Sequence, residues 1–595
     1  MTGIEPLLAD LAVQSGQQGA TIQEILLDLL PIALIAAGVG VFVAKVGKFP
    51  YTIALLLAGI GVSIIRFATG QFGIEIALSH DLILLVLLPP LLFEGAATTD
   101  LERLRRNLAP ILALAAVGLV TSVAVVGFVG NWAFSLVGTD FTILLALLFA
   151  AMALPTDPVS VLALFKELGA PDRLSVLVEG ESLVNDGVGV VIFTAFLGFV
   201  ASETAPSELF SASGLGSLAV EILVVSGGGL LVGLVAGYAV YSVMINLDEH
   251  MTEIVLTLIL TYGSFLLAEH YLHVSGVIAT VVAGLFIGNR GTEYAMSPQT
   301  KISVFNALET MAFLVNTFIF LMIGVTTPID QVADNAELIV VAIVLVLLAR
   351  AVAVYPITAV VNRFIDPAIP RKYQHVMWWG GLHGSIPIAL VLGLPPTLES
   401  GAAFPLREEL RAMVFGVAAF SLVVQGLTMS NLMDRLDIVT RSDAEELYEL
   451  LIGRRRAVEE ALDAAERLKR RGDLPREVYE DFTGEYEREQ EDLQEAIAAL
   501  LSSNPELRRE RLLVGERQVL QQEKSALMDA IRAGVITDDV GDRLLNEVNL
   551  KLEQVRNGET TVERDEEGYA EFWRSQAQEF GLDVEAEGDR RAMMD

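Results

Sequence analysis

The sequence predicts an all-α protein that crosses a membrane many times and ends in a helical, water-exposed tail. Three observations predict this fold class. Hydrophobic residues make up 53% of the 595 residues, charged residues make up only 19%, and the mean hydropathy is +0.54. Long apolar runs fill residues 24–435, and a helix needs about 20 apolar residues to cross a bilayer. Beyond residue 440 the chain is charged, with 40 Asp and Glu against 23 Lys and Arg, which is −17 of the total net charge of −34.

We count thirteen candidate membrane spans, and together with the composition they predict three domains. An extracytoplasmic segment covers 1–23, a membrane domain covers 24–435, and an acidic, mostly helical domain covers 440–595. The spans lie near residues 24–44, 50–69, 80–96, 108–133, 141–165, 176–200, 215–245, 252–271, 274–289, 306–326, 337–362, 373–394 and 410–433.

The distribution of basic residues predicts the orientation of these spans. With thirteen spans, the loops on the side of the tail hold thirteen Lys and Arg, whereas the opposite loops hold only Arg66, Arg407 and Arg411. Cytoplasmic loops carry the excess of basic residues in membrane proteins. We therefore expect a multi-pass protein of the cell membrane, with the N-terminus outside and the tail in the cytoplasm.

Composition also limits the chemistry. The chain has no cysteine, which excludes disulfides and thiolate ligands, and its six histidines show no metal-binding spacing. No nucleophile–base motif is present, so we expect neither an enzyme nor a bound cofactor. A sequence pI near 4.5 argues against a nucleic-acid partner and is typical of a halophilic microbe, because acidic surfaces stay hydrated in salt.

The stretch MALPTDPVSVLALF places a carboxylate between two prolines in the middle of the fifth span. Pro158 lacks an N–H and disfavours helical angles at Asp157, so the helix should be interrupted there and the carbonyl of Thr156 freed. Interrupted backbone inside a bilayer survives only where it is buried or lines a cavity. We interpret this stretch as part of a cation site, and the alternative is a simple proline kink.

The stretch GESLVNDGVGVVIF places two more carboxylates in the sixth span. Ser182 and Asp186 are four residues apart and share a helix face, and Glu181 and Asn185 form a neighbouring pair. Carboxylate and hydroxyl oxygens are hard ligands that suit Na⁺ or Li⁺, and the carboxylate can take a proton instead. For Asp186 we favour this role over a structural hydrogen-bond cluster.

Three other polar residues lie in apolar spans. Arg350 needs an anionic partner, because an unpaired guanidinium in a span costs several kcal/mol, and we predict that this partner is Glu181. That pairing leaves Asp186 free to bind a mobile cation. Glu94 is either a further ligand or an interfacial partner of a basic residue. His383, in a glycine-rich stretch, is either a packed residue or a pH-linked one.

Six segments together resemble sodium/proton antiporters of the NhaP/NHE type, in the monovalent cation:proton antiporter superfamily. In chain order these segments are LLPPLLFEGA, PTDPVSVLALFKELGAPDRL, VEGESLVNDGVGVVIF, LLAEHYLHVSGVIATVVAGL, LLARAVAVYP and GGLHGSIPIALVLGLP. They lie in order between residues 87 and 395, and the resemblance extends over about residues 30–435. The combination of PTDP with ESxxND is its specific part. One position departs from the family, which often has Arg where this chain has His383.

The resemblance implies a fold, an activity and a site. The fold is a bundle with inverted repeats, in which two broken helices cross near the membrane midplane, and the assembly is a homodimer. The activity is exchange of Na⁺ (or Li⁺) for H⁺ by alternating access, electroneutral, for Na⁺ export and pH homeostasis. The implied cation- and proton-binding residues are Asp186, Asp157, Ser182, Thr156, Glu94 and Asn185, with Glu181 and Arg350 as a structural ion pair.

Two alternatives to Na⁺/H⁺ exchange remain open at this point. One is K⁺/H⁺ exchange through the same site, and the other is a cation channel or a cation-coupled symporter. The tail is predicted to be helical and partly coiled-coil, since Ser442 and Glu445 form a capping box and leucines follow at helical spacing. It is either a regulatory or dimerising module, or an acidic solubilising tail.

Overall fold

The computed structural model describes residues 22–46, 50–69, 79–157, 161–162, 165, 169–245, 247, 249–292, 295–296, 298–438, 443–473, 475–556, 558 and 560. Nearly all of the predicted segment 1–23, Pro158 of the fifth span, and the predicted cap Ser442 lie outside these residues, as does the chain beyond residue 560. Contacts divide the chain into two units, residues 1–440 and 441–595.

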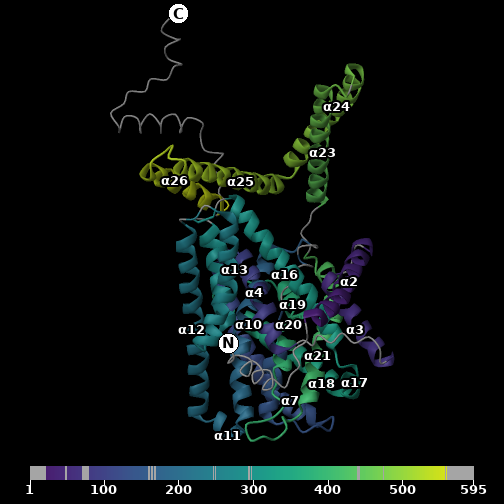
Figure 1. The fold of residues 1–595 in the computed structure, drawn as a ribbon, viewed down its shortest axis with the longest axis vertical. Coiled ribbons are helices and arrows are strands. Elements are labelled where there is room, and N and C mark those ends of the chain that lie inside the picture. Colours follow the sequence, from purple (N-terminus) through teal and green to yellow (C-terminus); the bar gives the residue numbers. More distant parts are fainter. Residues whose placement is uncertain are drawn as a thin grey trace, which may run out of the picture. The chain divides into compact units, whose positions relative to one another are not determined.

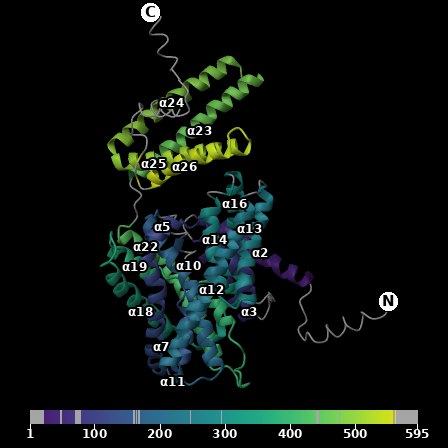
Figure 2. The same cartoon turned by 90° about the vertical axis from the view of Figure 1, so that its left-hand side faces the viewer.

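The first unit is a bundle of helices (Figures 1 and 2). Several of these helices contain a short π-helical turn, to which we give the label η. The helices up to residue 201 are α2 (Ile22–Val46), α3 (Tyr51–Thr69), η1 (Leu82–Leu87) with α4 (Leu88–Thr98), α5 (Leu101–Arg106), α6 (Leu108–Leu112) with η2 (Ala113–Gly118) and α7 (Leu119–Ser135), α8 (Ile143–Ala153) and α10 (Asp172–Ala201). The following ones are α11 (Pro206–Leu209), α12 (Ala212–Met244), α13 (His250–Leu266) with η3 (Leu267–Tyr271), α14 (Gly276–Phe286) with η4 (Ile287–Gly291), α16 (Pro298–Thr326), α17 (Ile329–Asp334), α18 (Ala336–Val361), α19 (Arg371–Trp379), α20 (Ser385–Leu392), and α21 (Arg407–Phe420) with η5 (Ser421–Gln425) and α22 (Gly426–Arg435).

Every predicted span overlaps one or more of these helices, so the predicted all-α membrane fold is confirmed. Eight helical stretches within the described residues have the length and hydropathy of a membrane span, and four shorter ones are also apolar. The remaining predicted span, 373–394, is divided into α19 and α20. The number of thirteen crossings stays a prediction.

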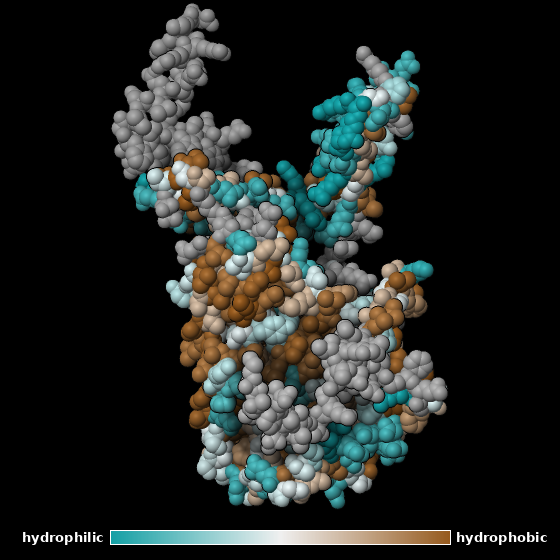
Figure 3. Space-filling view, viewed as in Figure 1, coloured by the Kyte–Doolittle hydropathy of each residue, from teal (hydrophilic) through white to brown (hydrophobic). Residues whose placement is uncertain are grey.

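The outside of this bundle is apolar. Hydrophobic residues cover much of the face seen in Figure 3, and α12 alone exposes Leu223 to 72% and Val235 to 69%. In water such a surface would drive aggregation, but lipid chains solvate it. The exposed leucines and valines therefore fit a bundle that is surrounded by a bilayer.

Glycines on α12 bring it close to α14. A Cβ on Gly233 would lie 2.8 Å from Cβ of Val282, and one on Gly229 would lie 2.5 Å from the carbonyl oxygen of Ser275. Both distances are shorter than van der Waals contact, so only glycine permits this approach of two helices.

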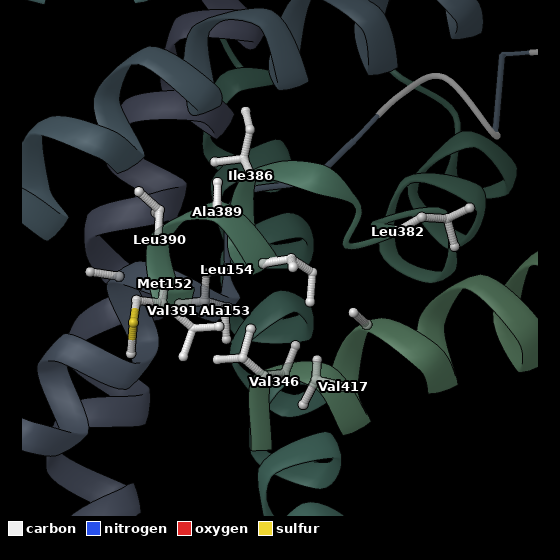
Figure 4. Close-up of a cluster of buried hydrophobic side chains, with 14 of the residues drawn as sticks. Met152, Ala153, Leu154, Val346, Leu382, Ile386, Ala389, Leu390, Val391 and Val417 are labelled. Atoms are coloured by element: carbon white, nitrogen blue, oxygen red, sulfur yellow. The ribbon is translucent and has the colours of Figure 1, made fainter. Parts of the chain in front are cut away.

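A buried hydrophobic cluster holds the interrupted helices together (Figure 4). Its labelled members are 0–4% exposed, and they come from the end of α8, the half-helix α20, the long helices α18 and α21, and the segment between α19 and α20. The labelled members are Met152, Ala153, Leu154, Val346, Leu382, Ile386, Ala389, Leu390, Val391 and Val417. Because these side chains are buried and closely packed, they hold the non-helical backbone after α8 and before α20 in a fixed position.

The second unit is helical, as predicted, and consists of two helical hairpins. Helix α23 (Asp443–Arg471) packs against α24 (Arg476–Ser503), and α25 (Pro505–Arg532) packs against α26 (Asp538–Arg556). The second hairpin has a small buried core of Leu520, Val548, Leu552 and Val555. The predicted regulatory or dimerising role of this unit stays a prediction.

Candidate cation site

The first interruption follows α8. This helix begins at a Thr142 cap, whose hydroxyl accepts the N–H of Leu145 at 3.3 Å, and it ends at Ala153. Residues 155–157 are not helical. Proline cannot donate a backbone hydrogen bond, so Pro155 favours an end to the helix here. The predicted interruption around Asp157 is confirmed, and Thr156 is 3% exposed within it.

The second interruption separates α19 from α20 over residues Gly380–Gly384, and the two interruptions are bonded to each other. The N–H of Asp157 donates to the carbonyl of Leu382 at 2.7 Å. Nδ1 of His383 lies 3.1 Å from the carbonyl oxygen of Pro155. A carbonyl oxygen only accepts, so Nδ1 of this histidine carries a proton and donates it. Two segments more than 220 residues apart therefore provide hydrogen-bond partners for each other's backbone groups.

Gly384 allows the second interruption to approach the Asp157 carboxyl group. A Cβ on Gly384 would overlap Oδ2 of Asp157 and would lie 2.7 Å from its Cβ. Carbon atoms do not approach this closely without displacing one another, so any larger residue must move either the carboxylate or the backbone. The glycine thus places Asp157 directly against the α19–α20 interruption.

Helix α10 supplies the third side of the site. The hydroxyl oxygens of Thr156 and Ser182 lie 3.0 Å apart, and Nδ2 of Asn185 lies 3.4 Å from Oγ1 of Thr156. Asp186 follows on the same helix, is 6% exposed, and lies within electrostatic reach of Asp157. The structure therefore brings five of the predicted residues together.

Two buried oxygen atoms at this place have no hydrogen-bond donor within the described part of the chain. They are Oδ1 of Asn185 and Oδ1 of Asp186. A buried oxygen without a donor costs free energy unless a proton or a cation binds it. The oxygens gathered here come from carboxylates, an amide and hydroxyls, which suit a hard cation. No group of three or more His, Cys, Asp or Glu placed to hold a metal ion occurs among the described residues.

Glu181 lies one step further round α10 and forms an ion pair with Arg350 of α18. Nη1 of Arg350 donates to Oε1 of Glu181, and Nη2 donates to the carbonyl of Met377 at 3.1 Å. The side chains are 2% and 12% exposed. The charge of Arg350 is therefore engaged by Glu181, and Asp186 is not part of this pair.

The two remaining predicted residues, Glu94 and His383, lie on elements other than α10. Glu94 is half-buried on α4. His383 is 3% exposed and joins the two interruptions, as described above. The ligand role of Glu94 and the pH-linked role of His383 stay predictions.

Three residues of the site were not singled out from the sequence. Gly384 is one of several glycines, and only the fold shows which of them faces a carboxylate. Ser421 and Gln425 are buried residues of η5 that bond to the α19–α20 interruption. Ser421 and Gln425 could have been found in the sequence as two polar residues four positions apart, and therefore on one helix face, inside the apolar span 410–433.

A helical membrane bundle in which two interrupted helices meet beside buried carboxylates is the arrangement of a secondary transporter. The family described as "Sodium/hydrogen exchanger, transmembrane" matches residues 32–435. This match covers more than half of the chain, so the chain belongs to the family of transmembrane sodium/hydrogen exchangers, and the predicted resemblance is confirmed.

Two curated relatives cover most of the chain. The Na⁺/H⁺ antiporter NhaG of Bacillus atrophaeus is 35% identical over 525 residues, which are 87% of this chain and 96% of the relative. The Na⁺/H⁺ antiporter ApNhaP of Aphanothece halophytica is 35% identical over 459 residues, 76% of this chain and 82% of the relative. Among solved structures, the sodium proton antiporter MjNhaP1 from Methanocaldococcus jannaschii has a similar fold, with a TM-score of 0.54 at 19% identity, covering 69% of this chain and 99% of that chain.

Proposed function

We propose that this protein exchanges Na⁺ for H⁺ by alternating access at Asp186. The observation that carries the proposal is the buried Oδ1 of Asp186, which has no donor within the described residues and lies on the same helix as Ser182, whose hydroxyl meets that of Thr156. The relatives that are Na⁺/H⁺ antiporters by name support Na⁺ as the cation. No observation favours K⁺/H⁺ exchange, a symporter or a channel.

Competition for one carboxylate explains the exchange. A charged carboxylate with no partner is costly inside a bilayer. Asp186 therefore holds either Na⁺ or a proton, and the protein changes its open side only when one of them is bound. Na⁺ leaves on one side and a proton replaces it on the other, so the proton gradient drives Na⁺ export.

The charges of the residues around Asp186 determine how much net charge one exchange cycle carries across the membrane. Asp157 adds a second negative charge near Asp186, and Thr156, Ser182 and Asn185 contribute neutral oxygens. Glu181 is neutralised by Arg350. With one exchangeable charge at Asp186, one Na⁺ exchanges for one proton and the cycle is electroneutral. We assign Glu94 to this set as a further ligand and His383 as its pH-linked member.

The orientation and assembly follow the same proposal. The protein lies in the cell membrane among lipids, with the N-terminus outside and the acidic tail in the cytoplasm, as the basic loops predict. The resemblance to the antiporter family supports a homodimer. In a salty habitat, which the acidic composition favours, Na⁺ export would serve both ion and pH homeostasis. No enzymatic reaction and no cofactor are part of the proposal.

A vesicle experiment tests the assignment. Purified protein is placed in vesicles with an internal pH dye, a pH gradient is formed, and dequenching is followed after addition of Na⁺, Li⁺ or K⁺. Wild-type protein should respond to Na⁺, and Asp186→Asn should lose the response completely, because a neutral amide cannot exchange a proton for a cation. Asp172→Asn is the matched control on the same helix, since the Asp172 side chain is 75% exposed. A normal Na⁺ response in Asp186→Asn, or a response to K⁺ alone in the wild type, would contradict the proposal.

A further inference from the structure

Two buried side chains of η5 bond to the interruption between α19 and α20. Ser421 is 0% exposed and its Oγ accepts the N–H of His383 at 3.0 Å. Gln425 is 2% exposed and its Nε2 donates to the carbonyl of Trp379 at 2.8 Å. These bonds come from the last helix of the bundle, which supplies none of the cation ligands named above.

The bonds satisfy backbone groups that the interruption leaves without a helical partner. Trp379 is the last residue of α19, so its carbonyl cannot accept from a following turn. His383 lies in the non-helical segment before α20, so its N–H has no helical acceptor. Inside a bilayer no water replaces a missing bond, so each of these groups needs a fixed partner. Ser421 can accept because its own proton is donated to the carbonyl of Ala418 at 2.9 Å.

The same five-residue interruption holds Asp157. The carbonyl of Leu382 accepts the N–H of Asp157 at 2.7 Å, and Leu382 lies between the two residues that η5 binds. A Cβ on Gly384 would overlap the Asp157 carboxylate, so this carboxylate also packs against the interruption directly. A shift of the interruption by a fraction of an ångström would therefore move Asp157 relative to Asp186.

We propose that Ser421 and Gln425 are positioning residues of the exchange site. They fix the interruption at both ends of the segment that carries Leu382, and through it they set the distance between Asp157 and the Asp186 site. This inference rests on the proposed exchange function. It also makes α21, η5 and α22 part of the rigid body that carries the site, since the bonds would break if the last helix stayed behind during a rocking motion. Short π-helical turns such as η5 often occur at functional places in helices.

The expected effect is on cation affinity rather than on the amount of active protein. Ser421→Ala and Gln425→Met each remove the buried hydrogen bond to the α19–α20 segment, and Ser421→Ala also removes the bond from Ser421 to the carbonyl of Ala418. In Gln425→Met the length of the side chain is kept. Each variant should raise the apparent KM for Na⁺ roughly fivefold to tenfold, the ratio that corresponds to one such bond. The rate at saturating Na⁺ should change less than twofold. Ser421→Thr keeps the hydroxyl and should restore the KM.

Ser63→Ala is the matched control. Ser63 is 7% exposed, and its Oγ donates to the carbonyl of Thr327 at 2.9 Å, so the substitution removes a buried serine bond that joins α3 to the residue after α16 and does not involve the α19–α20 interruption. It should change the yield of folded protein and not the KM. Any variant that only loses stability should likewise lower the yield of folded protein without changing the KM, whereas a variant that displaces Asp157 should raise the KM.

The experiment measures Na⁺-dependent dequenching in vesicles at several Na⁺ concentrations, with full-length protein and rates normalised to the folded protein in each sample. A KM raised in Ser421→Ala and Gln425→Met and restored in Ser421→Thr supports the inference. A KM within twofold of wild type in Gln425→Met overturns it, including when Ser421→Ala yields no folded protein. Absence of exchange in the wild type would instead overturn the proposed function, so the two failures are distinct.

Discussion

Replacing Arg350 by Met should destabilise the membrane unit by about 3–5 kcal/mol, the usual cost of removing one partner of a buried ion pair. The large value follows from the burial of the pair, with the Glu181 side chain 2% exposed and the Arg350 side chain 12% exposed. Oε2 of Glu181 already has no hydrogen-bond donor within the described part of the chain. Arg350→Met would remove the donor to Oε1 as well, and would leave a buried carboxylate with no partner.

Replacing Glu181 by Gln should cost less than Arg350→Met. The amide oxygen of Gln still accepts from Nη1, and Nη2 keeps its bond to the carbonyl of Met377. The loss should stay below the value of about 3–5 kcal/mol for Arg350→Met, because the hydrogen bonds remain and only the negative charge of the carboxylate is lost. The double variant Glu181→Met with Arg350→Met removes both charges of this pair. Its loss should be smaller than the sum of the losses of Glu181→Met and Arg350→Met measured separately.

The assay is equilibrium unfolding in mixed micelles, followed by tryptophan fluorescence. Trp378 reports on this region, because its Nε1 donates to the carbonyl of Leu347 on α18 at 3.0 Å. The control is Arg106→Met, which breaks an ion pair with Glu102 whose side chains are 55% and 40% exposed, and which should cost no more than about 0.5 kcal/mol. The reasoning is refuted if Arg350→Met costs less than about 1 kcal/mol, or if the double variant loses the full sum.

Two further predictions follow from the same structure. Gly384→Ala should reduce Na⁺-dependent exchange in vesicles by roughly tenfold or more, because a Cβ at this position overlaps the Asp157 carboxylate. The control is Gly263→Ala, where a Cβ meets nothing within 4 Å, and it should leave the exchange rate unchanged. Equal activities of the two variants would contradict the packing argument. In the tail, Arg454 donates two hydrogen bonds to Glu489, at 2.5 and 2.9 Å, and these bonds lower the pKa of Glu489. The pair therefore stabilises the packing of α23 against α24 fully at pH values above the ordinary pKa of glutamate, and this contribution is lost as the pH falls through the lowered pKa. Hydrogen exchange in α23 and α24 should therefore differ between the wild type and Glu489→Gln at neutral pH and converge in acid, and an unchanged difference in acid would exclude this pair as the cause.

Part of the site could be predicted because the bilayer makes local patterns decisive. Pro155 and Asp157 in mid-span predict an interruption, since the surrounding apolar run cannot otherwise tolerate them. Arg350 predicts a carboxylate partner for the same reason, and Glu181 is that partner in the structure. The four-residue spacing on α10 places Ser182 and Asp186 on one face. Each inference needs only the chain's own chemistry and the absence of water.

By itself, the sequence determined the all-α class, the places of the spans, the helical tail, the interruption at Asp157 and the candidate cation ligands, because burial in lipid restricts which residues can stand in a helix. Only the tertiary structure decided which groups the interruptions bind. Gly384 meets Asp157, and Ser421 and Gln425 meet the ends of the α19–α20 interruption. These contacts join residues that are tens to hundreds of positions apart, and a local pattern contains no information on which distant backbone groups a polar side chain will satisfy.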